Sequence, residues 1–489
     1  MEPIVRPFRR PTPESMRAFV TSTPLYRDDD DPGFWPAERL AARRDELLQR
    51  QLSWLAEASP YYQACFAREH IDPTTIKSVA DLVRLPVTTK ADLMSDPAAF
   101  RLRFASPSIY DMTYTTVYTT GTTTGRPTPY EYAGHDYLGA LLAGRRVFKM
   151  SYIMPGDLYL SLFPLSPLPH VAGFAGMFAS AAGVSFQHGM TGSPYADFPV
   201  HLSTRGLARK IAQLRPQALS GIGSFLRRMI VDAARDGCDF SSLKVVLASG
   251  EVFTERMRAH LRATLARCGA EDVFIASGYS FTEGGVGWSP CYEGGPMHPS
   301  APDQIYLETL DPKTYERLPD GAVGLLAATH LNRRGMPLLR YVLGDLTALS
   351  RERCSVCGRA GESLLVSAGS AHVTRTSELL KIKGTLVNPQ VIHEVVMNTA
   401  GVTEYQMIVA KQDPIDPDSP DKLVMRIGLD SPGEDQVWTE RQSQALRQAI
   451  FNATEVRPEI ELVADLSQIY DPIREVKARR IVDQRPGPA

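Results

Sequence analysis

The segment Thr119–Thr128 carries the residue types that a phosphate-binding loop needs. It reads Thr-Thr-Gly-Thr-Thr-Thr-Gly-Arg-Pro-Thr and follows the β-branched run Tyr114–Tyr118. Gly121 and Gly125 let the backbone turn so that consecutive N–H groups face one side, and the surrounding hydroxyls add donors. It is not a Walker loop, because no Gly-Lys-Ser/Thr follows. Taken alone, these residues leave two interpretations open, a nest for phosphate oxygens and a polar turn between strands.

A second group with chemical potential consists of three cysteines and one histidine. Cys354 and Cys357 are followed by Gly358, which is the turn of a zinc knuckle, because two thiolates at that spacing can hold one tetrahedral ion. Cys291 and His298 stand upstream and would complete a Cys₃His set. The alternative is a set of free, reduced thiols or a redox pair. Four protein ligands would leave no position for a substrate, so a site closed in this way would be structural.

Composition and charge limit the class of protein. The 489 residues include 53 Lys plus Arg and 55 Asp plus Glu, a formal net charge of −2. This balance predicts no overall attraction to nucleic acid or to an anionic membrane, although a local basic cleft is compatible with it. Hydrophobic residues at 43% and charged residues at 22% are typical of a globular protein and exclude bulk disorder. Six cysteines are too few for a disulfide scaffold.

The sequence shows no apparent export signal or membrane span. The N-terminal fifteen residues are basic but lack the apolar core of a secretory signal, so we expect a cytoplasmic location. The stretch Leu158–Ala196 has no charged residue and is long enough to cross a bilayer. Three prolines and several glycines would interrupt a helix there. We therefore expect a buried strand, Leu158–Phe163, then a proline-rich turn and a small-residue helix.

Alternating apolar patterns predict an α/β fold for the large, N-terminal part of the chain. An amphipathic helix is expected over Pro36–Ala58, where leucines recur at helical spacing. Further on, strand-like and helical runs alternate, which predicts mostly parallel sheets covered by helices. The expected strands there are Leu158–Phe163, Ala218–Ile222, Leu243–Ala248 and Asp272–Ala276, and the expected helices are Leu207–Leu214, Phe225–Arg235 and Thr254–Cys268. From about Ala322 short β-rich runs predict a β-barrel-like subdomain, at Gly324–His330, Leu338–Tyr341 and Leu346–Leu349.

The chain beyond Arg375 has the pattern of a separate, small α+β domain. Its expected elements are strand Leu379–Ile382, helix Pro389–Asn398, strands Glu404–Ala410 and Leu423–Leu429, helix Asp435–Asn452 and strand Glu459–Val463. The linker 413–421, rich in proline and aspartate, is expected to be a solvated hairpin loop. At roughly 150 residues per domain the length permits about three domains, or one large domain with an appendage. We assign 1–375 to a large domain and 376–489 to a small one.

Six motifs, in order, resemble those of the adenylate-forming (AMP-binding) superfamily, specifically its phenylacetate–CoA ligase-like branch. The loop at Thr119 is similar to the signature Thr/Ser-Gly-Thr-Thr-Gly-x-Pro. The other five are Ser249-Gly250-Glu251, Tyr279-Ser280-Phe281-Thr282-Glu283, the stretch Pro337–Thr347 with Gly-Asp-Leu-Thr, the domain crossover Arg375–Gly384 and the segment Arg474–Arg480. The stretch Ala58–Lys90 is also similar to the branch's N-terminal helical region.

The resemblance implies an enzyme that adenylates a carboxylate with ATP and then transfers the acyl group, usually to the thiol of coenzyme A. Positive charge and oriented N–H groups must then neutralise the triphosphate during attack on the α-phosphorus. The β- and γ-phosphates would be held by Thr119, Thr120, Gly121, Thr122, Thr123, Thr124 and Gly125. Thr282 would contact the α-phosphate, and Glu283 would hold Mg²⁺. Lys477 would bridge the carboxylate and the α-phosphate as a flexible point charge.

The resemblance also places the nucleoside of ATP. The adenine-side turn would be formed by Ser249, Gly250 and Glu251. Tyr279 would lie against the adenine ring. Asp345 would accept hydrogen bonds from both ribose hydroxyls, and Arg375 would support the ribose or its phosphate.

The sequence departs from the family pattern at three places. Ser280 and Val476 stand where glycine is usual, and Ser377 stands beside Glu378 at the hinge between the two domains. These departures concern the second half-reaction, because the small domain rotates between the half-reactions. They keep other acceptors or acids open, namely an amine, a carrier protein, or nitrite activated for diazotisation. A degenerate member that binds nucleotide without turnover is a third reading, which the intact acidic and lysine positions oppose.

The resemblance points to an aromatic or cyclic carboxylic acid as substrate. Tyr132 occupies the position that lines the aryl pocket, and Phe174 of the charge-free segment would add an apolar wall. His170 would orient a polar ring substituent or, alternatively, be a core histidine bonded to backbone. Some members carry a structural zinc at the positions of the Cys₃His set, and dimers are common in the branch. The implied partners are thus the acid, ATP and coenzyme A, with no nucleic acid and no membrane.

Overall fold

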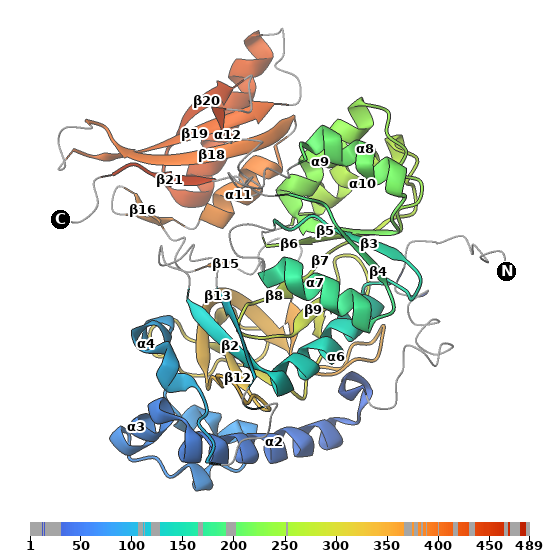
Figure 1. Ribbon diagram of the computed structural model, residues 1–489. Helices are drawn as coiled ribbons and strands as arrows, with labels where there is room; N and C mark the ends of the chain where they lie inside the picture. The colour runs from blue at the N-terminus through green and yellow to red at the C-terminus, as the bar shows by residue number, and fades with distance from the viewer. Residues whose placement is uncertain are drawn as a thin grey trace, which may run out of the picture.

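The computed structural model describes residues 12, 14, 31–105, 111, 113–118, 128–164, 170–191, 202–250, 253–365, 374–375, 380–382, 385–387, 389–399, 401–413, 419–429, 436–463, 468–469 and 480–485. At some of these positions, including His170 and Arg375, the description covers the backbone alone. Figure 1 shows the small C-terminal domain at one end of the molecule and the N-terminal helices at the other.

Helices make up the N-terminal region. They are η1 (Pro32–Phe34), α2 (Ala37–Ala58), α3 (Pro60–Arg68), η2 (Pro73–Thr75), η3 (Val79–Arg84), α4 (Lys90–Ser95) and η4 (Pro97–Phe100). The helix predicted from the leucine spacing is α2, and the leucines of that pattern are buried. Their face packs on Phe66 and Leu82 nearby and on Tyr130 and Leu338 far along the chain. This helical region is therefore held by distant parts of the sequence.

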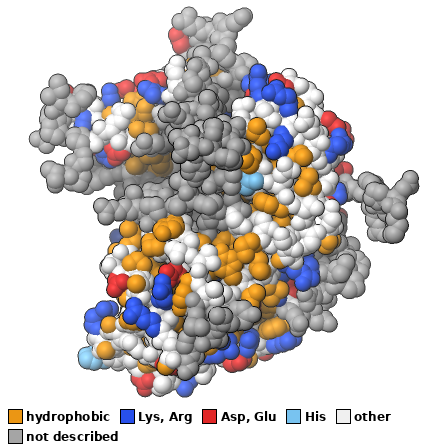
Figure 2. Space-filling view, in the orientation of Figure 1, with side chains coloured by type: hydrophobic (Ala, Val, Ile, Leu, Met, Phe, Trp, Pro, Cys, Tyr) orange, Lys and Arg blue, Asp and Glu red, His pale blue; other side chains and the backbone are white. Residues whose placement is uncertain are grey.

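A parallel sheet forms the centre of the next region, as the alternating pattern predicts. Its strand order is β4 (Ser185–His188), β3 (Leu158–Ser161), β5 (Ala218–Ile222), β6 (Val245–Ser249) and β7 (Phe274–Ser277). One face packs on α8 (Thr204–Leu214), α9 (Gly223–Arg235) and α10 (Glu255–Arg267), and the other on α6 (Gly134–Met150) and α7 (His170–Ala181). Figure 2 shows basic side chains mixed with acidic ones over the α8–α10 layer. None of the described helices combines the length and the hydropathy of a membrane span.

The β-rich region forms an eight-stranded sheet with antiparallel pairing. Along the sheet the order is β11 (Ile305–Leu310), β12 (Gly324–His330), β13 (Tyr341–Ser350), β14 (Ser363–Leu365), β10 (Met297–Pro299), β9 (Gly287–Pro290) and β8 (Tyr279–Ser280), with β15 (Thr374–Arg375) beside β13. A separate antiparallel pair is formed by β1 (Tyr114–Tyr118) and β2 (Pro129–Ala133). Parallel pairing in the large domain is thus confined to the β3–β7 sheet among the described strands.

The strand predicted at Leu338–Tyr341 is wrong, because the strand begins at Tyr341. Arg340 has φ 46°, a left-handed conformation that a strand cannot contain. Its buried guanidinium binds Glu308 at 3.3 Å and the Leu85 carbonyl at 2.7 Å. These contacts hold the kink, and the chain beyond it runs as one strand, β13, which includes the predicted Leu346–Leu349.

The small domain has the predicted α+β composition. Its elements are β16 (Leu380–Ile382), β17 (Thr385–Val387), α11 (Pro389–Met397), β18 (Val402–Lys411), β19 (Asp421–Leu429), α12 (Gln436–Thr454), β20 (Glu459–Val463) and β21 (Ile481–Asp483). Four of the strands form a sheet of order β20-β19-β18-β21. Strands β18 and β19 are the predicted antiparallel hairpin, whereas β20 and β21 join in parallel. The small domain lies against α9, as Figure 1 shows.

Candidate active site and Cys-His cluster

The Thr282–Gly284 turn between β8 and β9 holds two of the predicted site residues. The Glu283 carboxylate is buried, and the Tyr341 hydroxyl donates to its Oε1 at 3.0 Å. The Thr282 carbonyl accepts a hydrogen bond from the Tyr132 hydroxyl at 2.5 Å. Burial, reinforced by the Glu283 charge, raises the pKa of Tyr341, so its phenol stays protonated and a donor. The turn is therefore fixed by two buried tyrosines from other strands.

Arg333 is a third support of this turn, and the sequence analysis missed it. Its Nη2 donates to the Gly284 carbonyl at 2.5 Å and lies 3.4 Å from that of Glu283. Its guanidinium carbon is 4.7 Å from the centre of the Tyr132 ring. Its backbone exchanges two hydrogen bonds with Gln51 of α2, at 2.6 and 2.9 Å. No motif marks this arginine, because its partners are 49 or more residues away in sequence.

A glycine lets the turn approach these side chains. Gly285 has φ 65°, and a Cβ there would lie 2.9 Å from the Tyr132 ring and 3.1 Å from the Arg333 guanidinium. Any larger residue would therefore be strained and would also displace both supports. The sequence showed the glycine but gave no sign of what it faces.

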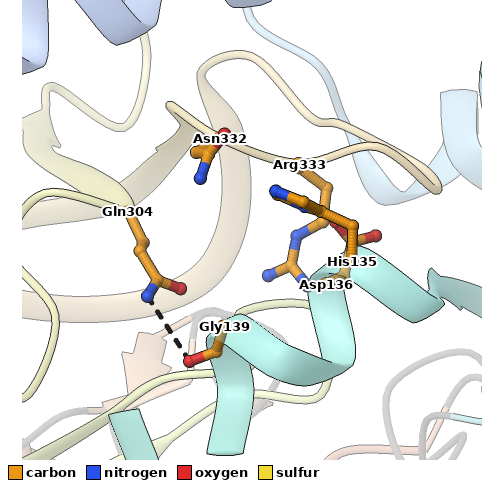
Figure 3. A pocket seen from close by; sticks show the side chains of 6 residues that line it. All are labelled: His135, Asp136, Gly139, Gln304, Asn332 and Arg333. Carbon is orange, nitrogen blue, oxygen red and sulfur yellow. Dashed lines mark hydrogen bonds and ion pairs between the residues drawn. The ribbon is translucent and has the colours of Figure 1, made fainter. Parts of the chain in front are cut away.

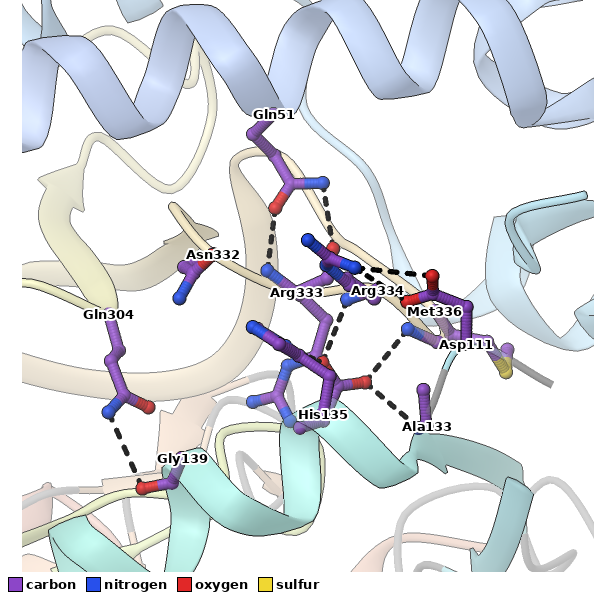
Figure 4. Close-up of polar contacts among 12 residues, drawn as sticks. Gln51, Asp111, Ala133, His135, Gly139, Gln304, Asn332, Arg333, Arg334 and Met336 are labelled. Atoms are coloured by element: carbon purple, nitrogen blue, oxygen red, sulfur yellow. Dashed lines mark hydrogen bonds and ion pairs between the residues drawn. The ribbon is translucent and has the colours of Figure 1, made fainter. Parts of the chain in front are cut away.

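A small polar pocket lies beside Arg333. Figure 3 shows its lining residues, His135, Asp136, Gly139, Gln304, Asn332 and Arg333. The Asp136 carboxylate is bound to the backbone around it: it accepts from the N–H groups of Ala133, Arg334 and Gly335 at 3.0, 2.8 and 2.8 Å. Figure 4 shows the two hydrogen bonds that join the Gln51 side chain to the Arg333 backbone nearby. None of the predicted substrate residues lines this pocket. Its polar groups instead tie the start of α6 to the Asn332–Gly335 loop.

Three of the residues predicted for the nucleoside, Ser249, Gly250 and Tyr279, lie at or beside the carboxyl ends of the parallel strands. Ser249 ends β6, and Gly250 after it has φ 81°. The Gly278 N–H bonds the Ala248 carbonyl at 3.0 Å, which places Tyr279 beside the end of β6. In open α/β sheets this edge is where ligands bind. The predicted adenine-side residues within the described chain therefore share one edge.

Tyr279 and Asp345 are in direct contact. The Tyr279 hydroxyl donates to Asp345 Oδ2 at 2.7 Å, and Asp345 is 5% exposed. The backbone of Arg375 pairs with that of Asp345 where β15 joins β13. The structure thus brings together Tyr279 and Asp345, which are 66 positions apart in the sequence, and Arg375, which follows Asp345 by 30 positions. The order of the motifs alone did not show this contact.

Tyr132 and Phe174 belong to one aromatic group. Their ring centres are 5.5 Å apart, and Tyr137 stacks on Phe174 at 5.2 Å with an angle of 16°. Phe178 follows at 5.2 Å from Phe174. Tyr132 is fully buried, and burial raises the pKa of its phenol. Tyr137 is the member of this group that the sequence did not indicate. His170 begins α7, but its side chain lies outside the description.

Several predicted residues lie outside the described part of the chain. These are Thr119, Thr120, Gly121, Thr122, Thr123, Thr124, Gly125, Glu251 and Lys477. The hinge residues Ser377 and Glu378 are outside it as well. The flanks of the phosphate loop are described: Tyr118 of β1 pairs with Pro129 of β2. The loop therefore connects two paired antiparallel strands, and its ends stand next to each other.

The three cysteines and the histidine of the second group come together. The ligand atoms of Cys291, His298, Cys354 and Cys357 all lie within 4.8 Å of one another. His298 Nδ1 is bonded to the Ser363 hydroxyl at 2.9 Å, and its buried Nε2 has no hydrogen-bond partner among the described residues. Donation from the Cys291 and Cys357 thiols holds the pKa of Cys354 well below its ordinary value. The arrangement matches the predicted Cys₃His set.

The segment 31–35 binds the loop that carries Cys354 and Cys357. Asp31 binds Arg359 with both carboxylate oxygens, at 2.9 and 3.0 Å. The Gly33 carbonyl accepts from the Ala360 N–H at 2.7 Å, and Arg353 donates to the Trp35 carbonyl. A Cβ on Gly33 would come within 2.5 Å of the Arg359 guanidinium, so only glycine permits this approach. The loop that carries two of the cysteines is thus fixed to the start of the described chain.

Two family assignments match the chain. Residues 63–330 match the AMP-binding enzyme family, and residues 384–485 match the AMP-binding enzyme C-terminal domain. A phenylacetate-coenzyme A ligase of Thermus thermophilus is 27% identical over 427 residues, which cover 85% of this chain and 89% of that protein. One of Aromatoleum evansii is 29% identical over 374 residues, covering 72% and 79%.

Solved structures share the fold. The chain is similar to a 2-hydroxyisobutyryl-CoA ligase in the postadenylation state in complex with R3-HIB-AMP, with a TM-score of 0.76, 21% identity and coverage of 92% of this chain and 91% of that one. The same ligase with 2-HIB-AMP and CoA in the thioesterification state gives 0.61 at 22% identity and equal coverage. The chain therefore overlays better on the first form than on the second.

Proposed function

Since the chain belongs to the AMP-binding enzyme family, in its phenylacetate–CoA ligase-like branch, we propose that it is an ATP-dependent, AMP-forming ligase that adenylates an aromatic carboxylic acid and transfers the acyl group to coenzyme A. One observation carries the choice of acid. The aromatic group of Tyr132, Tyr137 and Phe174 is joined to the Thr282–Glu283 turn by the 2.5 Å bond from Tyr132 to the Thr282 carbonyl. An aryl body at these rings would have its carboxylate directed toward the turn.

In this proposal the turn is the adenylation centre. Thr282 contacts the α-phosphate, and Glu283 supplies a carboxylate oxygen to Mg²⁺, which takes its remaining ligands from phosphate and water. A buried carboxylate held by one tyrosine hydroxyl fits such a hard cation. The ion would neutralise phosphate charge as the acid attacks. The turn itself stays in place because Arg333 and Tyr132 bind its carbonyls.

The nucleoside is assigned to the carboxyl edge of the parallel sheet. Tyr279 faces the adenine, and the Asp345 carboxylate, which can accept several hydrogen bonds, binds the ribose hydroxyls. Arg375 stands beside Asp345 through the strand pairing. Ser249, Gly250 and Glu251 border the adenine.

Two parts of the proposed machinery rest on the motifs alone. The loop from Thr119 to Gly125 is assigned to the β- and γ-phosphates, and Lys477 to the bridge between carboxylate and α-phosphate. The domain boundary after residue 375 belongs to the same group of proposals.

We further infer a structural zinc ion at Cys291, His298, Cys354 and Cys357. Three sulfurs and one imidazole nitrogen within 4.8 Å of one another are the donor set that tetrahedral Zn²⁺ prefers. The bond from Nδ1 to Ser363 leaves Nε2 of His298 for the ion. Near-stoichiometric zinc in protein purified without added metal is the expected result, and its absence would reject the assignment.

A second candidate keeps the adenylation and changes the acid or the acceptor to nitrite, an amine or a carrier protein. The departures at Ser280, Val476 and the hinge favour it. Pyrophosphate release should be screened over aryl acids, nitrite and no acid, each with and without coenzyme A. Release with an aryl acid and a thioester product supports the first function. Release with nitrite, or with an aryl acid but no thioester, supports the second, and no release with any acid rejects both.

A further inference from the structure

One buried carboxylate joins the two domains. Glu404, near the start of β18 in the small domain, is 0% exposed. Its Oε1 accepts from Nε of Arg480 at 3.1 Å, within the same domain. Its Oε2 lies 3.6 Å from Arg227 and 3.9 Å from Arg228, which stand on α9 of the large domain. The Glu404 carboxylate is therefore within ion-pair distance of arginines from both domains.

The surroundings of Glu404 are buried, so its negative charge would be unfavourable without a nearby cation. Arg227 and Arg228 are 5% and 8% exposed, so neither arginine is well hydrated where it stands. Burial alone would raise the pKa of Glu404, yet Arg480, Arg227 and Arg228 together hold it below its ordinary value. Separating the domains would take the large-domain arginines from the carboxylate and leave it with Arg480. Breaking such a buried ionic group by removing one partner is strongly unfavourable.

One member of this ionic group, Arg480, lies close in sequence to the proposed catalytic lysine. Arg480 stands three positions after Lys477 and directly before β21. Its carbonyl accepts from the Met407 N–H at 2.7 Å, and its guanidinium carbon is 5.3 Å from the centre of the Tyr405 ring. Tyr405 is in turn bonded to His393 of α11 at 2.8 Å. Arg480 is thus fixed by three residues of β18, one of which, Tyr405, is bonded to α11.

We propose that Glu404 is a positioning residue for the adenylation half-reaction: by binding Arg480 together with Arg227 and Arg228, it holds the small domain in the orientation that presents Lys477 to the large domain. This inference rests on the proposed function, because it assigns adenylation to Lys477. The domain arrangement supports it, since the chain overlays better on a postadenylation form than on a thioesterification form of one ligase.

The test compares the two half-reactions in the full-length variant Glu404→Gln. Pyrophosphate release with acid and ATP should fall about tenfold or more. ATP affinity, and thioester formation from supplied acyl-adenylate and coenzyme A, should change less than about twofold. The matched control is Glu461→Gln on β20, which removes an exposed carboxylate paired with Arg426 at 3.1 Å in the same domain. The control should leave both half-reactions unchanged. Equal losses in both half-reactions of Glu404→Gln, or no loss in either, would overturn the proposal.

A second variant covers the case in which Glu404→Gln does not fold. The double variant Arg227→Gln/Arg228→Gln keeps the Glu404–Arg480 pair and removes only the large-domain partners. It should show the same selective loss of adenylation, and unchanged adenylation in this variant would overturn the proposal. Failure of the proposed function is distinguishable, because the unmodified protein would then release no pyrophosphate. In that case the proposal is tested by amide hydrogen exchange in β21 and α9. A positioning role requires faster exchange in both elements of the double variant than in the unmodified protein, and unchanged exchange would overturn it.

Discussion

The structure adds to the sequence motifs mainly by showing which residues support the candidate site. It adds less about the residues that would contact ATP. Glu283 and Tyr341 both lie in motifs, but the motifs did not indicate their contact. Arg333 lies in no motif, and its role follows only from its contacts with the turn. Arg333 lies 50 positions from Glu283 and binds a backbone carbonyl, which any residue type at that position would offer. The sequence identifies residues whose side-chain type is required by the chemistry. It does not identify residues such as Arg333, which matter because the fold places them next to the site.

Replacing Arg333 should impair adenylation without weakening ATP binding. In Arg333→Met the Gly284 and Glu283 carbonyls lose a buried charged donor, a contact worth about 1.5–3 kcal/mol. The turn should then hold Glu283 less accurately, and kcat for pyrophosphate release should fall roughly tenfold or more while KM for ATP changes little. Arg334→Met is the control, because Arg334 binds Asp111 at 2.9 Å instead of the turn. An equal loss in both variants would contradict the positioning role.

Lys477 is expected to act in the transition state. Lys477→Ala should lower pyrophosphate release on the order of 100-fold or more, as loss of a preorganised charge contact does, while ATP binding stays nearly intact. Single-turnover pyrophosphate release and ATP titration measure the two quantities. Undiminished release would remove the assignment.

The proposed binding site for the acid can be probed at Phe174. Phe174→Ala removes the ring that stacks on Tyr137 at 5.2 Å and borders Tyr132 at 5.5 Å. KM for an aryl acid should rise about tenfold, since stacking and burial of an aromatic ring contribute on the order of 1–3 kcal/mol, and KM for ATP should not change. Steady-state kinetics with each substrate varied in turn provides the measurement. A rise in KM for ATP instead would place the acid elsewhere.

At the scale of elements, the sequence predicted most of the regular structure. Strands β5, β12 and β20 have the predicted bounds, and α8–α10 differ by a few residues, because long periodic patterns dominate their local preference. Some short strands were not predicted: β21 and β8 have three and two residues and no pattern of their own. They exist because a neighbouring strand offers them hydrogen bonds. The β13 start was also missed, since the conformation of Arg340 depends on Glu308 and Leu85.

The Cys-His cluster and the segment 31–35 are bound to each other, so loss of the proposed zinc ion should affect both. Cys354→Ser should reduce bound zinc to a small fraction, lower Tm, and speed tryptic cleavage after Arg353 and Arg359, since the loop would no longer be held. The matched control is Cys268→Ser, a buried thiol at the end of α10 that belongs to a different hydrophobic cluster. Metal analysis, thermal unfolding and mass spectrometry of the digest supply the readouts. Unchanged Tm and digestion would show that the metal does not hold the loop.

At the scale of the whole molecule, the contact between domains carries a defined pH dependence. The pKa of Glu404 is held below its ordinary value of 4.5, so the folded state binds this proton less readily than the unfolded state. The stabilisation is therefore present above the unfolded pKa and is lost as pH falls through the lower folded value. The difference in unfolding free energy between the unmodified protein and Glu404→Gln should be constant above about pH 5 and shrink below about pH 4. Urea unfolding at several pH values measures it, and a difference that grows toward acid pH would contradict the assignment.

The long-range bonds of the N-terminal helices have a consequence for synthesis of the chain. Arg44 binds Glu362, 318 positions later, and Asp31 binds Arg359, 328 positions later. A ribosome that adds 5–20 residues per second needs roughly 15–60 s to make that interval. During this time α2 exists without its partners. Arg44 of α2 and Asp31 before η1 then lack these partners and face water, and the apolar side of α2 relies on nearby helices or on a chaperone. A region made before its partners is thus among the last to reach its final contacts during synthesis.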